Sequence, residues 1–108
     1  MQKLIYDALV DAKAQDIAVL DVQKVSSFTD TMMIVSGTST RHVQSVADNV
    51  IYQMREHGVR PVGVEGEKIG EWVLIDFGPV VVHVMRPQTR DFYNLEKFWS
   101  DGQHIELK

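Results

Sequence analysis

Apolar residues recur at helical spacing in three parts of the chain. In the first part they are Leu4, Ile5, Ala8, Leu9 and Ala12. In the second they are Val43, Val46, Ala47, Val50, Ile51 and Met54, and the pattern ends at His57-Gly58. In the third, which follows Pro87 and stops near Gly102, they are Phe92, Leu95, Phe98 and Trp99. One apolar face per segment predicts three amphipathic helices.

Short aliphatic runs between these segments predict β-strands. The stretches 17–22 and 32–35 are typical of buried strands, and 59–64 of a short strand that Pro61 places at the edge of a sheet. The stretch 72–85 turns at Gly78-Pro79, as a hairpin of two strands does.

The order of these elements is helix, two strands, helix, three strands, helix. A helix between strands allows parallel pairing, whereas a tight turn requires antiparallel pairing. We therefore expect an α/β (α+β) fold, a mixed five-stranded sheet with helices packed on it. The 108 residues, 1–108, are expected to form a single domain.

The amino-acid composition excludes several kinds of site and partner. The absence of cysteine excludes disulfides, thiolate nucleophiles and sulfur-ligated zinc. A net charge of -4 argues against broad docking on nucleic-acid phosphates and favours a basic protein partner. No stretch is apolar enough to cross a bilayer, and Asp7 and Asp11 interrupt any signal-peptide pattern, so we expect a cytoplasmic protein.

The segment 36–42 is a candidate phosphate site, because a strand, a turn at Gly37 and a helix N-terminus can expose backbone N–H groups to an anion. The alternative, which we favour, is that Thr38 or Ser39 simply caps the helix. Nucleotidyl transfer would need a second carboxylate near Asp76 to hold metal ions, and the pattern supplies none. The histidines also lack metal-ligand spacing, so no metal or cofactor is expected.

Strand alternation sorts the hairpin residues into two faces. Residues 73, 75 and 77 are apolar and predict a core face, whereas Trp72, Leu74 and Asp76 lie on the other. An aromatic residue, an aliphatic residue and a carboxylate together are typical of a protein-binding surface. The alternative is that the last helix covers this face and Trp72 belongs to the core. Further candidates to line the region are His83, Arg90, Tyr93 and Glu96.

Several motifs closely resemble the ribosomal silencing factor S family, also called the Iojap family, in the same order and spacing from about Asp16 to Trp99. They are the segments 26–30 (SSFTD), 36–42 (SGTSTRH), 64–66 (VEG), 72–78 (WVLIDFG), 82–84 (VHV) and 90–96 (RDFYNLE).

The resemblance implies a nucleotidyltransferase-like fold without catalytic activity or cofactor. It also implies homodimers, and binding to large-subunit ribosomal protein fourteen, which blocks joining of the ribosomal subunits and represses translation when nutrients are short. The family motifs place the partner-binding residues at Trp72, Leu74, Asp76, His83, Arg90, Tyr93 and Glu96. The alternatives are a nucleotidyltransferase-like enzyme or nucleotide-binding protein, and a direct binder of ribosomal RNA, although no direct nucleic-acid specificity is expected.

The chain departs from the family pattern at two positions. It has Pro79 where an aspartate commonly follows the hairpin glycine, and Thr31 where an aromatic residue often follows Thr-Asp. It therefore lacks any contact that the turn carboxylate would make.

Overall fold

The computed structural model describes residues 1–99 and 103–104. In this part of the chain the elements are, in order, α1 (Gln2–Asp11), β1 (Gln15–Asp21), β2 (Thr31–Ser36), α2 (Thr40–Glu56), β3 (Gly63–Glu65), β4 (Trp72–Asp76), β5 (Val80–Met85), α3 (Pro87–Tyr93), α4 (Leu95–Phe98) and β6 (Gln103–His104). None of the helices described is both long and apolar enough to span a membrane.

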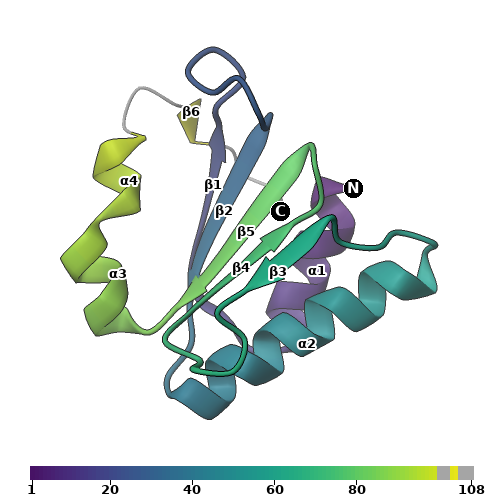
Figure 1. Ribbon diagram of the computed structural model, residues 1–108, viewed down its shortest axis with the longest axis vertical. Helices are drawn as coiled ribbons and strands as arrows, with labels where there is room; N and C mark the ends of the chain where they lie inside the picture. Colours follow the sequence, from purple (N-terminus) through teal and green to yellow (C-terminus); the bar gives the residue numbers. More distant parts are fainter. Residues whose placement is uncertain (100–102, 105–108) are drawn as a thin grey trace.

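The strands form one mixed sheet with the order β3-β4-β5-β2-β1-β6 (Figure 1). β2 and β5 pair in parallel, and every other neighbouring pair is antiparallel. The predicted mixed five-stranded sheet is confirmed, and the two-residue β6 extends it at one edge. β3 lies at the opposite edge, as Pro61 predicted, but it begins at Gly63 rather than Val59.

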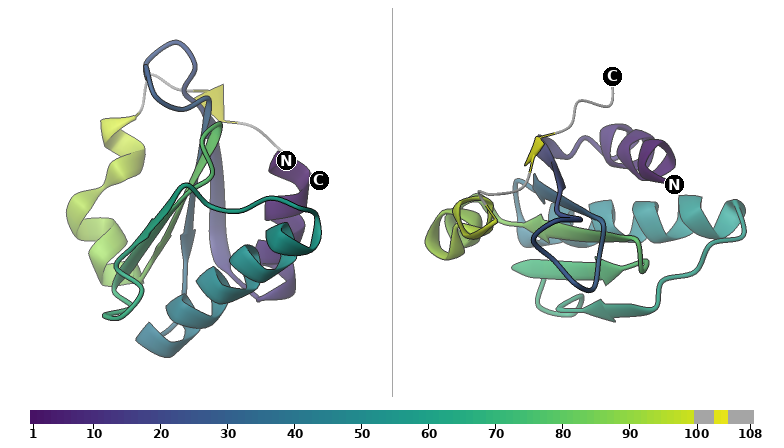
Figure 2. Two further views of the ribbon diagram at one scale, coloured as in Figure 1. Left: turned by 45° about the vertical axis from the view of Figure 1, so that its right-hand side comes forward. Right: turned by 90° about the horizontal axis from the view of Figure 1, so that it is seen from above.

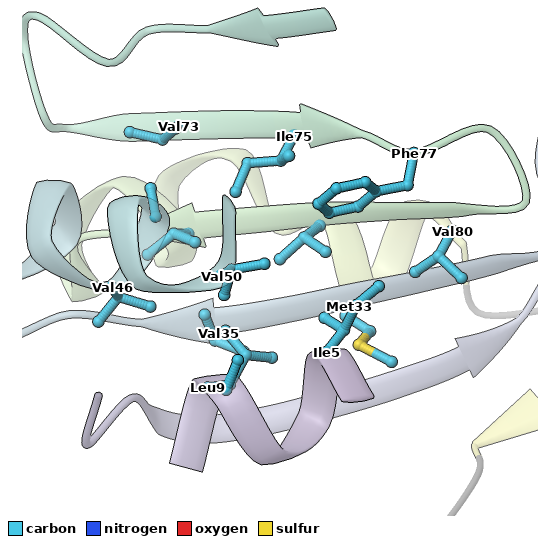
Figure 3. Packing of buried hydrophobic residues seen from close by; sticks show 14 of the residues in the cluster. Ile5, Leu9, Met33, Val35, Val46, Val50, Val73, Ile75, Phe77 and Val80 are labelled. Atoms are coloured by element: carbon cyan, nitrogen blue, oxygen red, sulfur yellow. The ribbon is translucent and has the colours of Figure 1, made fainter. Parts of the chain in front are cut away.

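Helices α1 and α2 pack side by side on one face of the sheet (Figure 2). Alternate strand residues point toward them and form the main core with the apolar stripes of both helices (Figure 3). This core includes Ile5, Leu9, Val46, Val50, Met33, Val35, Val73, Ile75 and Phe77. The two predicted helical stripes are therefore confirmed as core-facing.

Helices α3 and α4 stand on the opposite face of the sheet (Figure 2). The buried residues on that side are Leu20, Val22, Met32, Ile34 and Met85, and Trp72, Leu95 and Trp99 pack against them while remaining partly exposed. Two short helices cover less of a sheet than the pair α1 and α2 can, so this second core is smaller.

The prediction of one continuous final helix was wrong. Asn94 adopts a left-handed backbone conformation, with φ 47° and ψ 56°, and separates α3 from α4. The predicted apolar stripe is split by this break: Leu95 and Trp99 pack on the sheet, whereas the side chains of Phe92 and Phe98 are 81% and 76% exposed. The predicted helix end near Gly102 lies outside the described residues.

The turn between β2 and α2 is a close-packed junction. A Cβ atom on Gly37 would lie 2.7 Å from Cγ2 and 2.9 Å from the backbone nitrogen of Val43, which is itself fully buried. Only glycine therefore lets the helix begin so close to the strand.

We expect Gly37→Ala to lower the free energy of unfolding by about 1–3 kcal/mol, because the added methyl group overpacks against the backbone of α2. Gly63→Ala is the matched control, since a Cβ atom there meets nothing within 4 Å. Urea denaturation of both variants measures the difference. Equal stability of the two variants would contradict the close-packing account.

Candidate functional site

The residues predicted to face away from the main core do so. Strand β4 alternates between partly buried Trp72, Leu74 and Asp76 and fully buried Val73 and Ile75. In the ladder between β4 and β5, Leu74 lies directly opposite His83. Residues opposite each other in an antiparallel pair share a face. Trp72, Leu74, Asp76 and His83 therefore all lie on the face that carries α3 and α4.

Trp72 and His83 are joined by a hydrogen bond in which indole Nε1–H donates to imidazole Nδ1 at 2.9 Å. The His83 side chain is buried, with 5% of the residue exposed, and this burial lowers its pKa from 6.5 to about 4. His83 is therefore neutral at physiological pH, which leaves Nδ1 free to accept the hydrogen bond.

Tyr93 contacts the indole of Trp72 from α3. The two ring centroids are 4.8 Å apart, and the rings are tilted by 49°. Tyr93 itself is 53% exposed, and the ring of Phe92 lies against it edge-on at 5.0 Å. Helix α3 therefore covers one side of the indole and leaves the residue partly open to solvent. The interpretation of Trp72 as a core residue holds only in part, and its role in partner binding stays a prediction.

Arg90 and Glu96 fix the position of the two short helices. The Arg90 side chain is only 11% exposed; its Nε donates to Glu96 at 2.7 Å and its Nη1 donates to Ser36 Oγ at 2.9 Å. These bonds cross the break at Asn94 and reach the end of β2. The charge-assisted bond between Arg90 and Glu96 stabilises α3, and it thereby holds Tyr93 in position.

The start of α3 is tied to the start of β4. The carboxylate of Glu71, next to Trp72 in the chain, accepts hydrogen bonds from Arg86 at 3.4 Å and Thr89 at 3.2 Å. The backbone N–H of Arg86 also donates to the Glu71 carbonyl at 3.0 Å. The helix that carries Tyr93 is therefore held close to the strand that carries Trp72.

Asp76 closes the hairpin turn. Its Oδ1 accepts the backbone N–H of Gly78 at 2.7 Å, and Gly78 has a φ of 90°, which glycine adopts without strain. Asp76 pairs with Val81 rather than His83 in the ladder, so the two polar residues are not direct neighbours across the strands.

The two departures from the family pattern lie beside each other. The carbonyl of Pro79 accepts the backbone N–H groups of Asp30 and Thr31 at 3.1 Å and 3.0 Å. The Thr31 side chain is buried and accepts a hydrogen bond from Gln2 at 2.5 Å. Both residues thus join the hairpin turn to β2 and α1.

The turn before α2 uses its polar groups internally. Ser39 Oγ accepts the backbone N–H of His42 at 3.0 Å, which confirms the helix-cap interpretation. His42 in turn accepts the Thr38 N–H on Nδ1 at 2.8 Å, and its Nε2 donates to the Ala12 carbonyl at 2.9 Å. His42 therefore links the end of α1 to the start of α2, and the Thr38 and His42 N–H groups are not offered to a phosphate.

Residues 1–99 and 103–104 contain no group of three or more His, Cys, Asp or Glu side chains arranged to hold a metal ion. His57, like His42 and His83, has an internal hydrogen bond, through Nδ1 to the Gln53 carbonyl at 3.0 Å. The face of the sheet that carries α3 and α4 presents aromatic and aliphatic side chains around Trp72, and a surface of this kind is suited to binding another macromolecule.

Sequence reasoning did not identify the exposed phenylalanines Phe28, Phe92 and Phe98. Phe28 is 70% exposed and lies edge-on to Trp99 at 6.4 Å. Phe92 and Phe98 were assigned to a core-facing stripe. The available signal was Asn94, because asparagine tolerates the left-handed conformation that ends a helix, and residues on either side of such an ending do not share one helical face.

Comparisons with known proteins agree with one another. The model of the family described as ribosomal silencing factor during starvation (RsfS) matches residues 1–108. The ribosomal silencing factor RsfS of Chromobacterium violaceum is 46% identical over 100 residues, which cover 93% of this chain and 82% of that protein. RsfS of Haemophilus influenzae is 38% identical over 98 residues, covering 91% and 96%. A crystal structure of a Chromobacterium violaceum protein superposes with a TM-score of 0.90 at 45% identity, covering 97% of this chain and 87% of that one.

The lowered pKa of His83 makes stability depend on pH. Between pH 6.5 and about 4 the unfolded chain binds a proton that the folded protein does not, so the free energy of unfolding is highest above pH 6.5 and falls as the pH drops through this window. We expect a loss of at most about 3 kcal/mol from this residue. Urea denaturation at a series of pH values measures it, with His83→Phe as the comparison. Parallel pH profiles for wild type and variant would show that His83 is not responsible.

Proposed function

The chain belongs to the family of ribosomal silencing factors, and on this basis we propose that it binds the large ribosomal subunit through ribosomal protein fourteen and keeps the small subunit from joining. Translation is thereby repressed when nutrients are limited. The protein acts by occupying a surface, without catalysis or a cofactor, in the cytoplasm and as a homodimer.

The observation that carries this proposal is the state of Trp72. Its indole is held by His83 and Tyr93, yet the residue remains partly exposed beside partly exposed Leu74. Tryptophan and tyrosine in such a setting are the residue types that dominate binding energy at protein interfaces. Trp72, Leu74 and Tyr93 together form apolar surface on one face, and apolar surface shared by neighbouring side chains supports a site that a partner covers.

The seven candidate residues divide by their contacts. Trp72, Leu74 and Tyr93 present side-chain surface on this face, and we propose that they touch the partner directly. Arg90 and Glu96 are proposed to contribute by holding Tyr93 in place, since each is committed to the other. Asp76 is proposed to keep the hairpin turn in shape and to set a negative charge at the rim of the surface. His83 is buried and presents almost no surface of its own.

Charge supports a ribosomal protein as the partner. The chain carries a net charge of -4, whereas ribosomal proteins are generally basic because they pack against RNA. Complementary charge raises the association rate and disfavours docking on the RNA phosphates themselves. The same charge argues against direct RNA binding as the main interaction.

Size supports a steric mechanism. The molecule has a radius of gyration of 12.5 Å and extents of 33 × 32 × 26 Å. A body of these dimensions, docked where the large subunit meets the small one, is too thick for the two to close around it. Exclusion of this kind uses only the free energy of binding, so no nucleotide hydrolysis is required.

We expect Trp72→Ala to weaken binding to ribosomal protein fourteen by about 2–4 kcal/mol, because it removes the central aromatic anchor. Isothermal titration calorimetry measures the affinity, and circular dichroism checks that the variant is folded. Tyr52→Ala is the control: Tyr52 is an aromatic residue that is 54% exposed, more than partly buried Trp72, and it lies on α2 behind the opposite face of the sheet. An equal effect of the two variants, or none from Trp72→Ala, would remove Trp72 from the interface.

The steric mechanism predicts that order of addition matters. Added to separated subunits, the protein should hold them apart in sucrose-gradient sedimentation. Added to joined ribosomes it should do much less, because the docking surface on the large subunit is then covered. Trp72→Ala should be inactive in both orders, and omission of nucleotide should change nothing. Equal splitting in both orders, or dependence on nucleotide, would indicate active disassembly instead.

A further inference from the structure

We propose that His83 is a positioning residue for the docking surface: its unprotonated Nδ1 fixes the orientation of the Trp72 indole, so that the partner meets a ring that is already in place. The inference rests on the proposed function, in which Trp72 is the anchor. It assigns to His83 a role through Trp72 rather than a contact of its own.

His83 is well placed to serve as a fixed support. It lies on β5, where its backbone is paired with Leu74 of β4 on one side and Ile34 of β2 on the other. β5 is therefore an interior strand, held by hydrogen bonds along both of its edges. With only 5% of the residue exposed, His83 offers a partner almost no surface. A role at the interface must therefore pass through the side chain that His83 touches.

The chemistry of the hydrogen bond fixes one form of the imidazole. Indole Nε1–H can only donate, so the atom it meets, Nδ1, must carry a lone pair. The single proton of the neutral ring is then on Nε2. Any state with a proton on Nδ1 would set two donors against each other at 2.9 Å. The indole is thus aligned by one specific tautomer of one residue.

A second contact restrains the other side of the ring. Tyr93 packs on the indole at 4.8 Å between centroids, whereas the imidazole centroid is 5.8 Å away. The hydrogen bond fixes the edge of the indole and the tyrosine limits its tilt. An anchor whose rotamer is already selected loses less conformational freedom on binding, which strengthens affinity without any additional contact.

Two substitutions at position 83 distinguish the hydrogen bond that His83 accepts from the packing that its ring provides. His83→Phe keeps a planar ring but removes the acceptor, whereas His83→Asn provides a carbonyl oxygen close to the place of Nδ1. We expect His83→Phe to weaken binding to ribosomal protein fourteen on the order of tenfold and His83→Asn to recover most of that loss. Calorimetry measures both, with circular dichroism to verify folding.

A double-mutant cycle tests whether the effect passes through the indole N–H. In a Trp72→Phe background there is no N–H to hold, so adding His83→Phe should cost almost nothing further. If His83→Phe weakens binding equally in both backgrounds, or not at all in the wild type, the positioning role is wrong.

Nuclear magnetic resonance of the free protein provides a readout that does not depend on the partner. In a Trp99→Phe background, the single indole N–H signal should exchange slowly with solvent, and His83→Phe should speed that exchange at least tenfold. Imidazole ¹⁵N shifts should show Nδ1 unprotonated and Nε2 protonated. A proton on Nδ1, or equal exchange rates in the wild type and His83→Phe, would overturn the inference even if binding is normal. If the wild type shows these signals but does not bind ribosomal protein fourteen, the proposed function is wrong. His83 then still orients Trp72, but not for docking on that protein.

Discussion

The parallel pairing of β2 with β5 is the constraint on which the rest of this structure depends. The two strands occupy the middle of the sheet, and every residue in both is buried. Strands buried on both faces need cover on both, so helices must pack on each side of the sheet. The long helix α2 and α1 satisfy one face. The other receives only the short helices α3 and α4, and the unequal cover is what leaves Trp72 partly exposed at the margin of a core.

A histidine in the middle of such a strand is costly unless its ring has a partner. Burial also disfavours the charged form of the ring, which lowers the pKa of His83 to about 4. Trp72 offsets part of the cost of burying the neutral ring by donating a hydrogen bond to Nδ1. The same hydrogen bond restricts the orientation of the indole. One polar contact therefore has two effects: it gives Nδ1 of the buried imidazole a partner and it orients a partly exposed aromatic side chain. Leucine at position 83 would be easier to bury but would leave the indole unaligned.

Local patterns in the sequence were sufficient to predict features that depend on neighbouring residues, such as the face of a strand or helix on which a side chain lies. Alternation along 72–77 assigned each hairpin residue to the correct face, and the stripe from Val43 to Met54 identified the core side of α2. The break at Asn94 was not predicted, because the apolar spacing continues past it and Asn94 is only a single residue that tolerates a left-handed backbone. The contacts of Arg90 escaped for a different reason: Ser36 is 54 positions away, and only the tertiary fold brings the two together. Contacts of that kind have no periodic signature.

The strand–turn–helix at 36–42 uses its polar groups in bonds within the fold. A helix N-terminus attracts an anion only while its backbone N–H groups lack partners. Here the Thr38 N–H is taken by His42 and the His42 N–H by Ser39, while the tight approach of Gly37 to Val43 serves packing. The same imidazole donates from Nε2 to the Ala12 carbonyl at the end of α1, so the side chain that occupies the Thr38 N–H also links the two helices. Because the polar groups of this turn bond within the fold, they leave the half-covered face around Trp72 as the surface that we propose for docking.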